Sequence, residues 1–200
     1  MSKGGAPLRP GDERDISIGK FEIEAEDVFH LKTLYESMHD WLLEEGFKDI
    51  DGFEDRFEQL YWERTGATGA KEFHIWWRVA NDPETSKYYR QFLRVDFQGL
   101  NSKEVEIMHK GQKVKTNKTD LIIRMEGILQ LDPNNKMGKG FWKGFELLYR
   151  KRFFEERREQ FRDELYNKVY RLSARIKAYL KLKTPYKAPR PFRPELGLLE

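Results

Sequence analysis

Arginine and aromatic residues alternate in two segments near the middle of the chain, and together they could bind nucleic acid. Aromatic rings on an open sheet stack on unpaired bases, and arginine binds phosphate through two parallel hydrogen bonds. If the segments 73–82 and 88–100 are extended, alternate residues fall on one face. We therefore predict a nucleic-acid-binding sheet face made of His74, Trp76, Arg78, Arg90, Phe92, Arg94 and Arg124.

The same arginines have a second interpretation. Glu63, Asp96 and Glu126 lie in neighbouring extended segments, and oppositely charged pairs across antiparallel strands are common. In that case the arginines stabilise the sheet and bind no ligand. A third interpretation is that a tail or another subunit covers this face.

The second half of the chain is strongly basic. Residues 1–100 carry 13 basic and 21 acidic residues, a net charge of −8, whereas residues 101–200 carry 24 and 13, a net charge of +11. Such an excess is typical of a surface that contacts phosphates. The residues predicted to contact nucleic acid are Lys136, Lys139, Lys143, Lys151, Arg158, Arg162, Lys168, Arg171, Arg175, Lys177, Lys181, Lys183, Lys187, Arg190 and Arg193.

The excess of basic residues is also consistent with roles that involve no nucleic acid. Glutamates at 155, 156 and 159 can pair with arginines one helical turn away, and a charged helix surface is common in thermophilic proteins. Opposite charges on the two halves could also drive self-association. The best basic candidate follows Glu164, because no acidic residue occurs again until Glu195. That stretch could instead be a linker to the apolar residues Leu196–Leu199.

A glycine- and lysine-rich stretch at 134–144 precedes the long helix. Gly138 and Gly140 permit close approach of the backbone, so the stretch could cradle a phosphate. It has neither the Walker spacing nor the Gly-x-Gly-x-x-Gly spacing. A plain loop is the simpler interpretation.

Residues suited to catalysis or metal binding are few. The absence of cysteine excludes disulfides, thiolate metal sites and cysteine nucleophiles. His30 and His39 are too far apart on one helix to share a metal ion, and the acidic residues around Asp49 lack EF-hand spacing. No hydrolase motif is present. We expect no metal and no cofactor, and these residues favour a protein that is not an enzyme.

Apolar periodicity predicts one folded unit. The 200 residues include 14 Phe, 9 Tyr and 5 Trp, enough to build a core. No apolar run approaches the roughly 18 residues of a membrane span, and the polar N-terminus lacks a signal peptide. We expect a cytoplasmic protein without a membrane segment.

The order of elements follows from changes of period. A strand at 18–25 precedes a helix at 26–45, and further strands are expected near 57–64, 73–82, 88–100, 105–109 and 119–131. A long helix at 141–182 follows. Its second half carries an apolar stripe formed by Phe161, Leu165, Val169, Leu172, Ile176 and Leu180.

These elements predict an α+β fold. We expect an antiparallel meander of five to six strands, packed on an N-terminal helix and a long C-terminal helix. The order is similar to the helix-grip architecture of START-like ligand-binding proteins. The predicted organisation is a disordered tail at 1–17, a single domain at 18–182 and a basic, proline-rich tail at 183–200.

Several short motifs resemble an archaeal family of hypothetical proteins. They are Tyr61-Trp-Glu-Arg-Thr-Gly66, Trp76-Trp-Arg78, Met108-His-Lys-Gly111 and Val169-Tyr-Arg-Leu172. The resemblance covers about 60–185 and implies an archaeal source and a cytoplasmic setting. It implies no activity, so no functional residue follows from it.

Three functions are consistent with these features. The first is a non-enzymatic protein that binds RNA or a ribosomal subunit through its basic helix and tail. More specifically, it could form a homodimer or act as a factor that occupies ribosomes. The second is a helix-grip protein with a ligand cavity lined by Trp77, Phe97, Met125 and Phe161. The third is a hydrolase that uses Mg²⁺ and would need three converging carboxylates.

Overall fold

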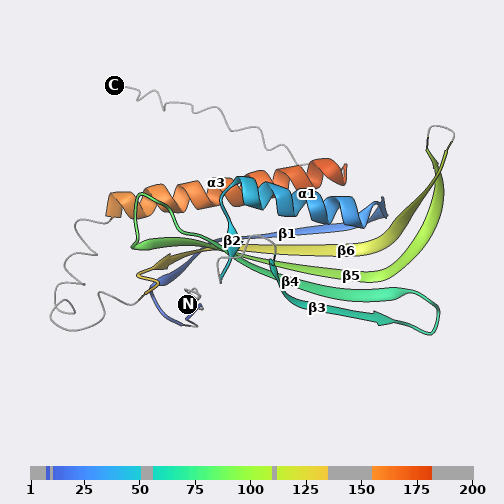
Figure 1. The fold of residues 1–200 in the computed structure, drawn as a ribbon, viewed down its shortest axis with the longest axis horizontal. Coiled ribbons are helices and arrows are strands. Elements are labelled where there is room, and N and C mark those ends of the chain that lie inside the picture. Colours follow the sequence, from blue (N-terminus) through green and yellow to red (C-terminus); the bar gives the residue numbers. More distant parts are fainter. Residues whose placement is uncertain (1–7, 10, 51–55, 110–111, 135–154, 182–200) are drawn as a thin grey trace, which may run out of the picture.

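The computed structural model describes residues 8–9, 11–50, 56–109, 112–134 and 155–181. They form an antiparallel six-stranded sheet with two helices on one face, which confirms the predicted α+β fold (Figure 1). The elements are β1 (Asp15–Phe29), α1 (Leu31–Glu44), β2 (Lys48–Asp49), β3 (Glu58–Thr65), β4 (Lys71–Asn81), β5 (Tyr89–His109), β6 (Gln112–Leu131) and α3 (Glu155–Tyr179).

The sheet pairs its first strand with its last. The strand order is β1-β6-β5-β4-β2, and β3 pairs with the remaining length of β4. All of these pairs are antiparallel. β1 and β3 therefore lie toward opposite edges of the sheet, and α1 and α3 cover the same face (Figure 1).

The core lies between this face and the two helices. Alternate residues of β4, such as Ile75, Trp77 and Val79, are buried there, as expected for a strand with one face packed and one face open. The indole of Trp77 packs against Phe97, with ring centroids 4.9 Å apart, and its Nε1–H donates to the hydroxyl of Tyr35 at 3.1 Å. The apolar stripe predicted for the long helix is confirmed, because all six of its residues are buried.

The connection between β1 and α1 differs from the prediction. A helix was expected from Glu26, but β1 continues to Phe29 and α1 begins at Leu31. The imidazole of His30 caps the helix by accepting from Thr33 N–H at 3.2 Å. Pairing with β6 up to Asn117 keeps this segment extended, which outweighs the acidic residues suited to a first helical turn. Gly46 follows the helix with φ of 82°, the left-handed conformation that glycine adopts readily at a helix end.

β5 and β6 extend beyond the rest of the sheet. Two strands were expected at 88–100 and 105–109, but both belong to β5, with an irregularity between Leu100 and Lys103. Pairing with β4 ends at Ser102 and pairing with β1 ends at Asn117. Past these residues the two strands pair only with each other, and Figure 1 shows them curving away as a ribbon.

The N-terminal residues add a contact to the edge of the sheet. The tail predicted at 1–17 is too long, because β1 begins at Asp15 and Arg9 contacts the sheet. The Arg9 guanidinium donates to Asp15 Oδ1 at 2.9 Å and to the carbonyl of Leu131 at 2.8 Å. The predicted first half of the long helix, at 141–154, and the predicted tail at 183–200 lie outside the described residues.

Candidate nucleic-acid interface

The face of the sheet opposite the helices carries charged and aromatic side chains. Its charged part consists of side chains that alternate with the core residues of β1, β4, β5 and β6. We call this group the ion-pair lattice, and its members are Lys20, Glu22, Arg78, Arg94, Asp96, Arg124 and Glu126.

The members of the ion-pair lattice neutralise one another across neighbouring strands. Arg78 Nη1 lies 2.6 Å from Asp96 Oδ1, and Arg94 Nη1 lies 3.1 Å from Glu126 Oε2. Arg124 contacts strands on both sides: its Nε lies 3.2 Å from Glu22 Oε2, and its Nη1 donates to the amide oxygen of Gln98 at 3.1 Å. The interpretation as cross-strand ion pairs therefore describes Arg78, Arg94 and Arg124, and Asp96 and Glu126 are among their partners. Glu63 pairs instead with Lys71.

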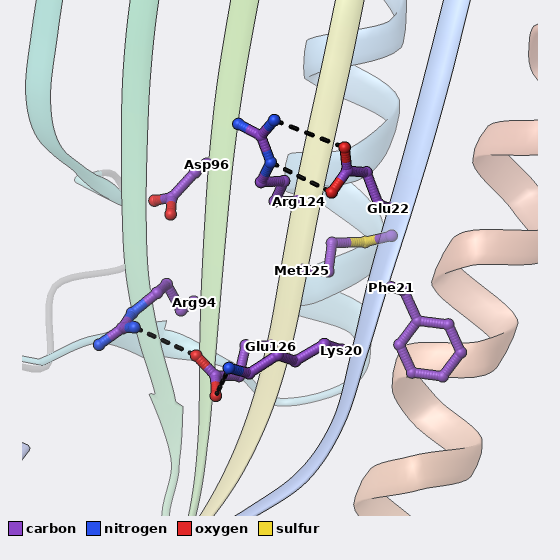
Figure 2. Close-up of a pocket in the computed structure, with 8 residues that line it drawn as sticks. All are labelled: Lys20, Phe21, Glu22, Arg94, Asp96, Arg124, Met125 and Glu126. Carbon is purple, nitrogen blue, oxygen red and sulfur yellow. Dashed lines mark hydrogen bonds and ion pairs between the residues drawn. The ribbon is translucent and has the colours of Figure 1, made fainter.

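A shallow hollow of about 400 Å³ lies over this lattice. Figure 2 shows charged side chains of alternating sign around it, whereas the ring of Phe21 points toward α3. Lys20 adds a second cation to Glu126 at 3.6 Å. The lattice has four cations and three carboxylates, so it offers little net attraction to a phosphate.

An aromatic group flanks the lattice on β3 and β4. Trp62 lies opposite His74, and their ring centroids are 5.3 Å apart. Trp76 is the next side chain on that face, and the guanidinium of Arg78 lies 5.6 Å from its ring centroid. Trp62 is 41% exposed and Trp76 is 44% exposed. We call Trp62, His74 and Trp76 the aromatic platform.

Arg64 provides a cation beside the aromatic platform. It follows Trp62 by two residues on β3 and therefore lies on the same face. Its strand partner is Glu72, but within the described part of the chain no ion pair of Arg64 is found. The carboxylate of Glu72 lies 3.7 Å from His74 Nε2 instead. A phosphate group near the platform could thus contact a guanidinium that is not already paired.

Sequence reasoning missed Trp62 and Arg64 because it did not determine how β3 pairs. Trp62 pairs with His74 and therefore shares its open face, whereas Phe57, five residues earlier, lies in the core. Alternation within 57–64 separates these two residues. It does not show that Trp62 lies beside His74 and Trp76 of the neighbouring strand.

Two residues predicted for this face are not available to a ligand. Phe92 is only 2% exposed, so it cannot stack on a base. Arg90 is also buried, and its guanidinium holds both carboxylate oxygens of Asp82 at 2.6 and 2.9 Å. Both predictions are wrong because this end of the open face is covered, which strand alternation cannot indicate.

The described cations of α3 divide into paired and unpaired residues. Arg158 and Arg162 pair with Glu159, and Arg171 pairs with Glu45 at 3.1 Å. Arg175 donates to the hydroxyl of Ser37 at 3.3 Å. Among the described residues, Lys177 and Lys181 have no acidic partner. These cations lie on the helix layer, on the side of the sheet away from the aromatic platform (Figure 1).

Lys168 is a structural residue, contrary to its predicted role. It is 8% exposed, and its ammonium lies 2.9 Å from Glu164 Oε1 and 3.1 Å from the amide oxygen of Gln91. It also donates to the carbonyl of Glu45 at 3.4 Å. Its charge is thus used inside the protein, where α3 meets β5 and the end of α1.

The remaining predicted contacts lie outside the described residues: Lys136, Lys139, Lys143, Lys151, Lys183, Lys187, Arg190 and Arg193. Within the described ranges no group of three His, Asp or Glu side chains could hold a metal ion. None of the helices that the structure describes is long and apolar enough to cross a membrane.

Comparison with known proteins adds no relative. The chain matches no family model, no curated protein and no solved structure. The resemblance to an archaeal family therefore stays a prediction.

Proposed function

We propose that the protein binds single-stranded segments of RNA by stacking bases on the aromatic platform. The observation that carries the proposal is the exposure of Trp62 and Trp76 around His74, on an open sheet face with Arg64 beside them. Water solvates indole rings poorly, so two exposed tryptophans on one surface favour an aromatic or apolar partner.

The chemistry of the platform fits unpaired bases. Each base that stacks on an aromatic ring contributes roughly 1–3 kcal/mol, whatever its sequence. Arg64 would contact phosphate, and the exposed rings would select a single strand because the bases of a duplex are already stacked. The paired arginines of the lattice would contribute little to RNA binding, because each would have to break its ion pair with a carboxylate before it could bind a phosphate.

The basic helix would contribute a separate contact. Arg175, Lys177 and Lys181 lie on the other side of the sheet, so one short strand cannot reach both surfaces. A large folded RNA, such as that of a ribosomal subunit, could contact both, and the net charge of +11 in residues 101–200 would favour its approach. The cytoplasmic location and an archaeal source remain parts of this proposal.

The test compares two neighbouring residues on opposite faces of β3. Trp62→Ala should weaken binding of a fluorescent single-stranded RNA at least tenfold, because stacking is lost. Tyr61→Ala is the matched control, since Tyr61 is 55% exposed but pairs with Ile75 on the other face. Equal effects of the two substitutions, or no binding at low salt, would overturn the proposal.

The salt dependence tests the two cationic contacts. Arg64→Gln should reduce the slope of log affinity against log salt by about 0.7, the value of one lost phosphate contact on a single strand. Replacing Lys181, Lys183, Arg190 and Arg193 by Glu should abolish binding to ribosomal subunits. Unchanged affinity would show that the helix end and tail take no part.

The ligand-cavity alternative has less support. Trp77, Phe97 and Met125 are buried and pack within one core cluster, and Phe161 packs instead with Tyr89. The hollow described above lies on the open face of the sheet, and six of the eight residues that line it are charged.

A further inference from the structure

The outer edge of β1 is an unoccupied strand edge among the described residues. β1 is the terminal strand of the sheet, and its inner edge pairs with β6 from Asp15 to Phe29. A strand edge of this length presents a row of N–H and C=O groups that can pair with another strand. No described strand pairs with it.

The hydrogen-bond pattern shows which residues present these groups. Leu131 N–H donates to the carbonyl of Arg14, next to the Asp15–Gln130 pair. The backbone N–H and C=O groups of Asp15 and Gln130 therefore do not bond to each other. The bulge between Ser17 and Gly19 adds a residue to β1 but none to β6, so the alternation continues along β6, and Glu126 and Arg124 belong to the same class of pairs as Gln130. Their partners on β1, Lys20 and Glu22, therefore direct their backbone N–H and C=O groups outward.

An aromatic surface lies beside this edge on the helix layer. Tyr166 is 44% exposed and Tyr170 is 52% exposed, and their rings stack with centroids 6.5 Å apart. Tyr166 also packs on Phe21 of β1 at 5.7 Å. Gly19 leaves room for both rings, because a Cβ there would lie 3.3 Å from Phe21 and 3.5 Å from Tyr166.

We propose that a second copy of this chain occupies the edge, with the two β1 strands antiparallel about a twofold axis at Phe21. In this register Lys20 of each copy lies opposite Glu22 of the other, which gives two complementary ion pairs. The two Phe21 residues meet at the axis. The two sheets become one continuous sheet with all four helices on the same face.

The helix layer fits this arrangement. α3 packs on both β1 and β6, so it lies over the space between them. Adding a strand spacing of about 4.8 Å at the new junction places the two copies of α3 about 10 Å apart, the distance at which helices pack. Tyr166 and Tyr170 of each copy then become buried between them.

Charges on an edge strand usually prevent such pairing, and β1 carries several acidic residues. In the register centred on Phe21, however, the pairs next to the axis bring no like charges together, and the bulge between Ser17 and Gly19 interrupts the register beyond Ile23 of the second copy. Acidic residues meet only near the ends of the strands, where Asp15 lies opposite the segment Glu26–Asp27. The register centred on Phe21 therefore pairs opposite charges next to the axis. A register centred on Lys20 or on Glu22 would instead place two identical charges opposite each other.

The experiment measures the mass of the full-length protein in the absence of RNA, by sedimentation over a concentration series. The wild type should reach twice the chain mass of 24.0 kDa. Glu22→Lys should weaken dimerisation at least tenfold, and Lys20→Glu with Glu22→Lys should restore it because the pairs are exchanged. Glu24→Lys is the matched control and should have a smaller effect, since it meets no charge.

A second measurement identifies the occupant if a substitution damages folding. Hydrogen exchange at the amides of Lys20, Glu22 and Glu24 should slow as protein concentration rises. Slow exchange at every concentration would indicate that a segment of the same chain covers the edge, and fast exchange at every concentration would indicate that nothing does. Either result, or a monomeric wild type, overturns the proposal. RNA binding by the aromatic platform is measured separately and does not depend on the outcome.

Discussion

The guanidinium of Arg78 lies between the carboxylate of Asp96 and the ring of Trp76. Its Nη1 is 2.6 Å from Asp96 Oδ1, and its Cζ is 5.6 Å from the centroid of the indole. It also donates to the carbonyl of Trp77 at 2.7 Å. Arg78 thus holds the aromatic platform in place and joins it to the ion-pair lattice.

We expect this pair to contribute measurably to stability. In a double-mutant cycle, Arg78→Ala and Asp96→Ala should show a coupling of about 1–2 kcal/mol in the free energy of unfolding, because the pair is partly shielded from water. The exposed pair of Arg158 and Glu155 on α3 is the control and should couple by less than about 0.5 kcal/mol. Urea denaturation measures both, and equal couplings would contradict the assignment.

Gly99 is required by the core. A Cβ at this position would overlap ring atoms of Phe73, which is itself buried. Gly99→Ala should therefore lower the free energy of unfolding by about 1–3 kcal/mol through overpacking. Gly66→Ala is a suitable control, because its Cβ would lie 3.4 Å from the nearest atom. A neutral Gly99→Ala variant would mean that the Phe73 ring can move aside.

The buried ammonium of Lys168 supports the contact of α3 with the sheet. Lys168→Met removes the donor to Gln91 and to the carbonyl of Glu45. We expect a loss of about 1–3 kcal/mol in the free energy of unfolding, since acceptors are left without a partner. Arg175→Met should cost less than about 0.5 kcal/mol, because Arg175 is exposed and bonds to Ser37. Chemical denaturation of the two variants makes the comparison.

Glu164 should make stability depend on acid pH. Burial raises the pKa of Glu164, but hydrogen bonds from Lys168 and Gln91 and the charge of Lys168 outweigh it, so the pKa lies below its usual value. A lowered pKa in the folded state stabilises the protein above the usual pKa of about 4.3. That contribution is lost as the pH falls through the lowered value.

The measurement compares the wild type with Glu164→Gln between about pH 6 and pH 2. The wild type should be more stable at the upper end, and the difference should shrink toward the lower end. In a Lys168→Met background the pH dependence of this difference should largely disappear. A difference that stays constant with pH would contradict the assignment.

The helical and strand periodicities were enough to predict the layers of this fold. The stripe from Phe161 to Leu180 is buried as predicted, because a helix that packs on a sheet needs one continuous apolar face. The alternation in β4 likewise separated Trp77 from Trp76 correctly. These features depend on local spacing, which the sequence displays directly.

The details of the site depend on contacts between distant segments, and the sequence did not display them. Lys168 was predicted to be exposed because lysine usually is, yet the end of α1 covers it. Trp62 was missed because its position beside His74 is a property of the pairing of β3 with β4. Phe92 has the right alternation for an exposed ring, but its end of the sheet is covered.

The pairing of β1 with β6 has a consequence for how the chain folds during synthesis. Phe21 pairs with Met125, so the partner of the first strand is made more than 100 residues later. Such distant contacts slow folding, because a long loop must close before they form. The hairpins from β3 to β6 can form early, whereas β1 must wait for β6, and α3 follows both. A nascent chain of this protein therefore carries an unpaired first strand through most of its synthesis, and the charges of β1 oppose its aggregation until β6 is made.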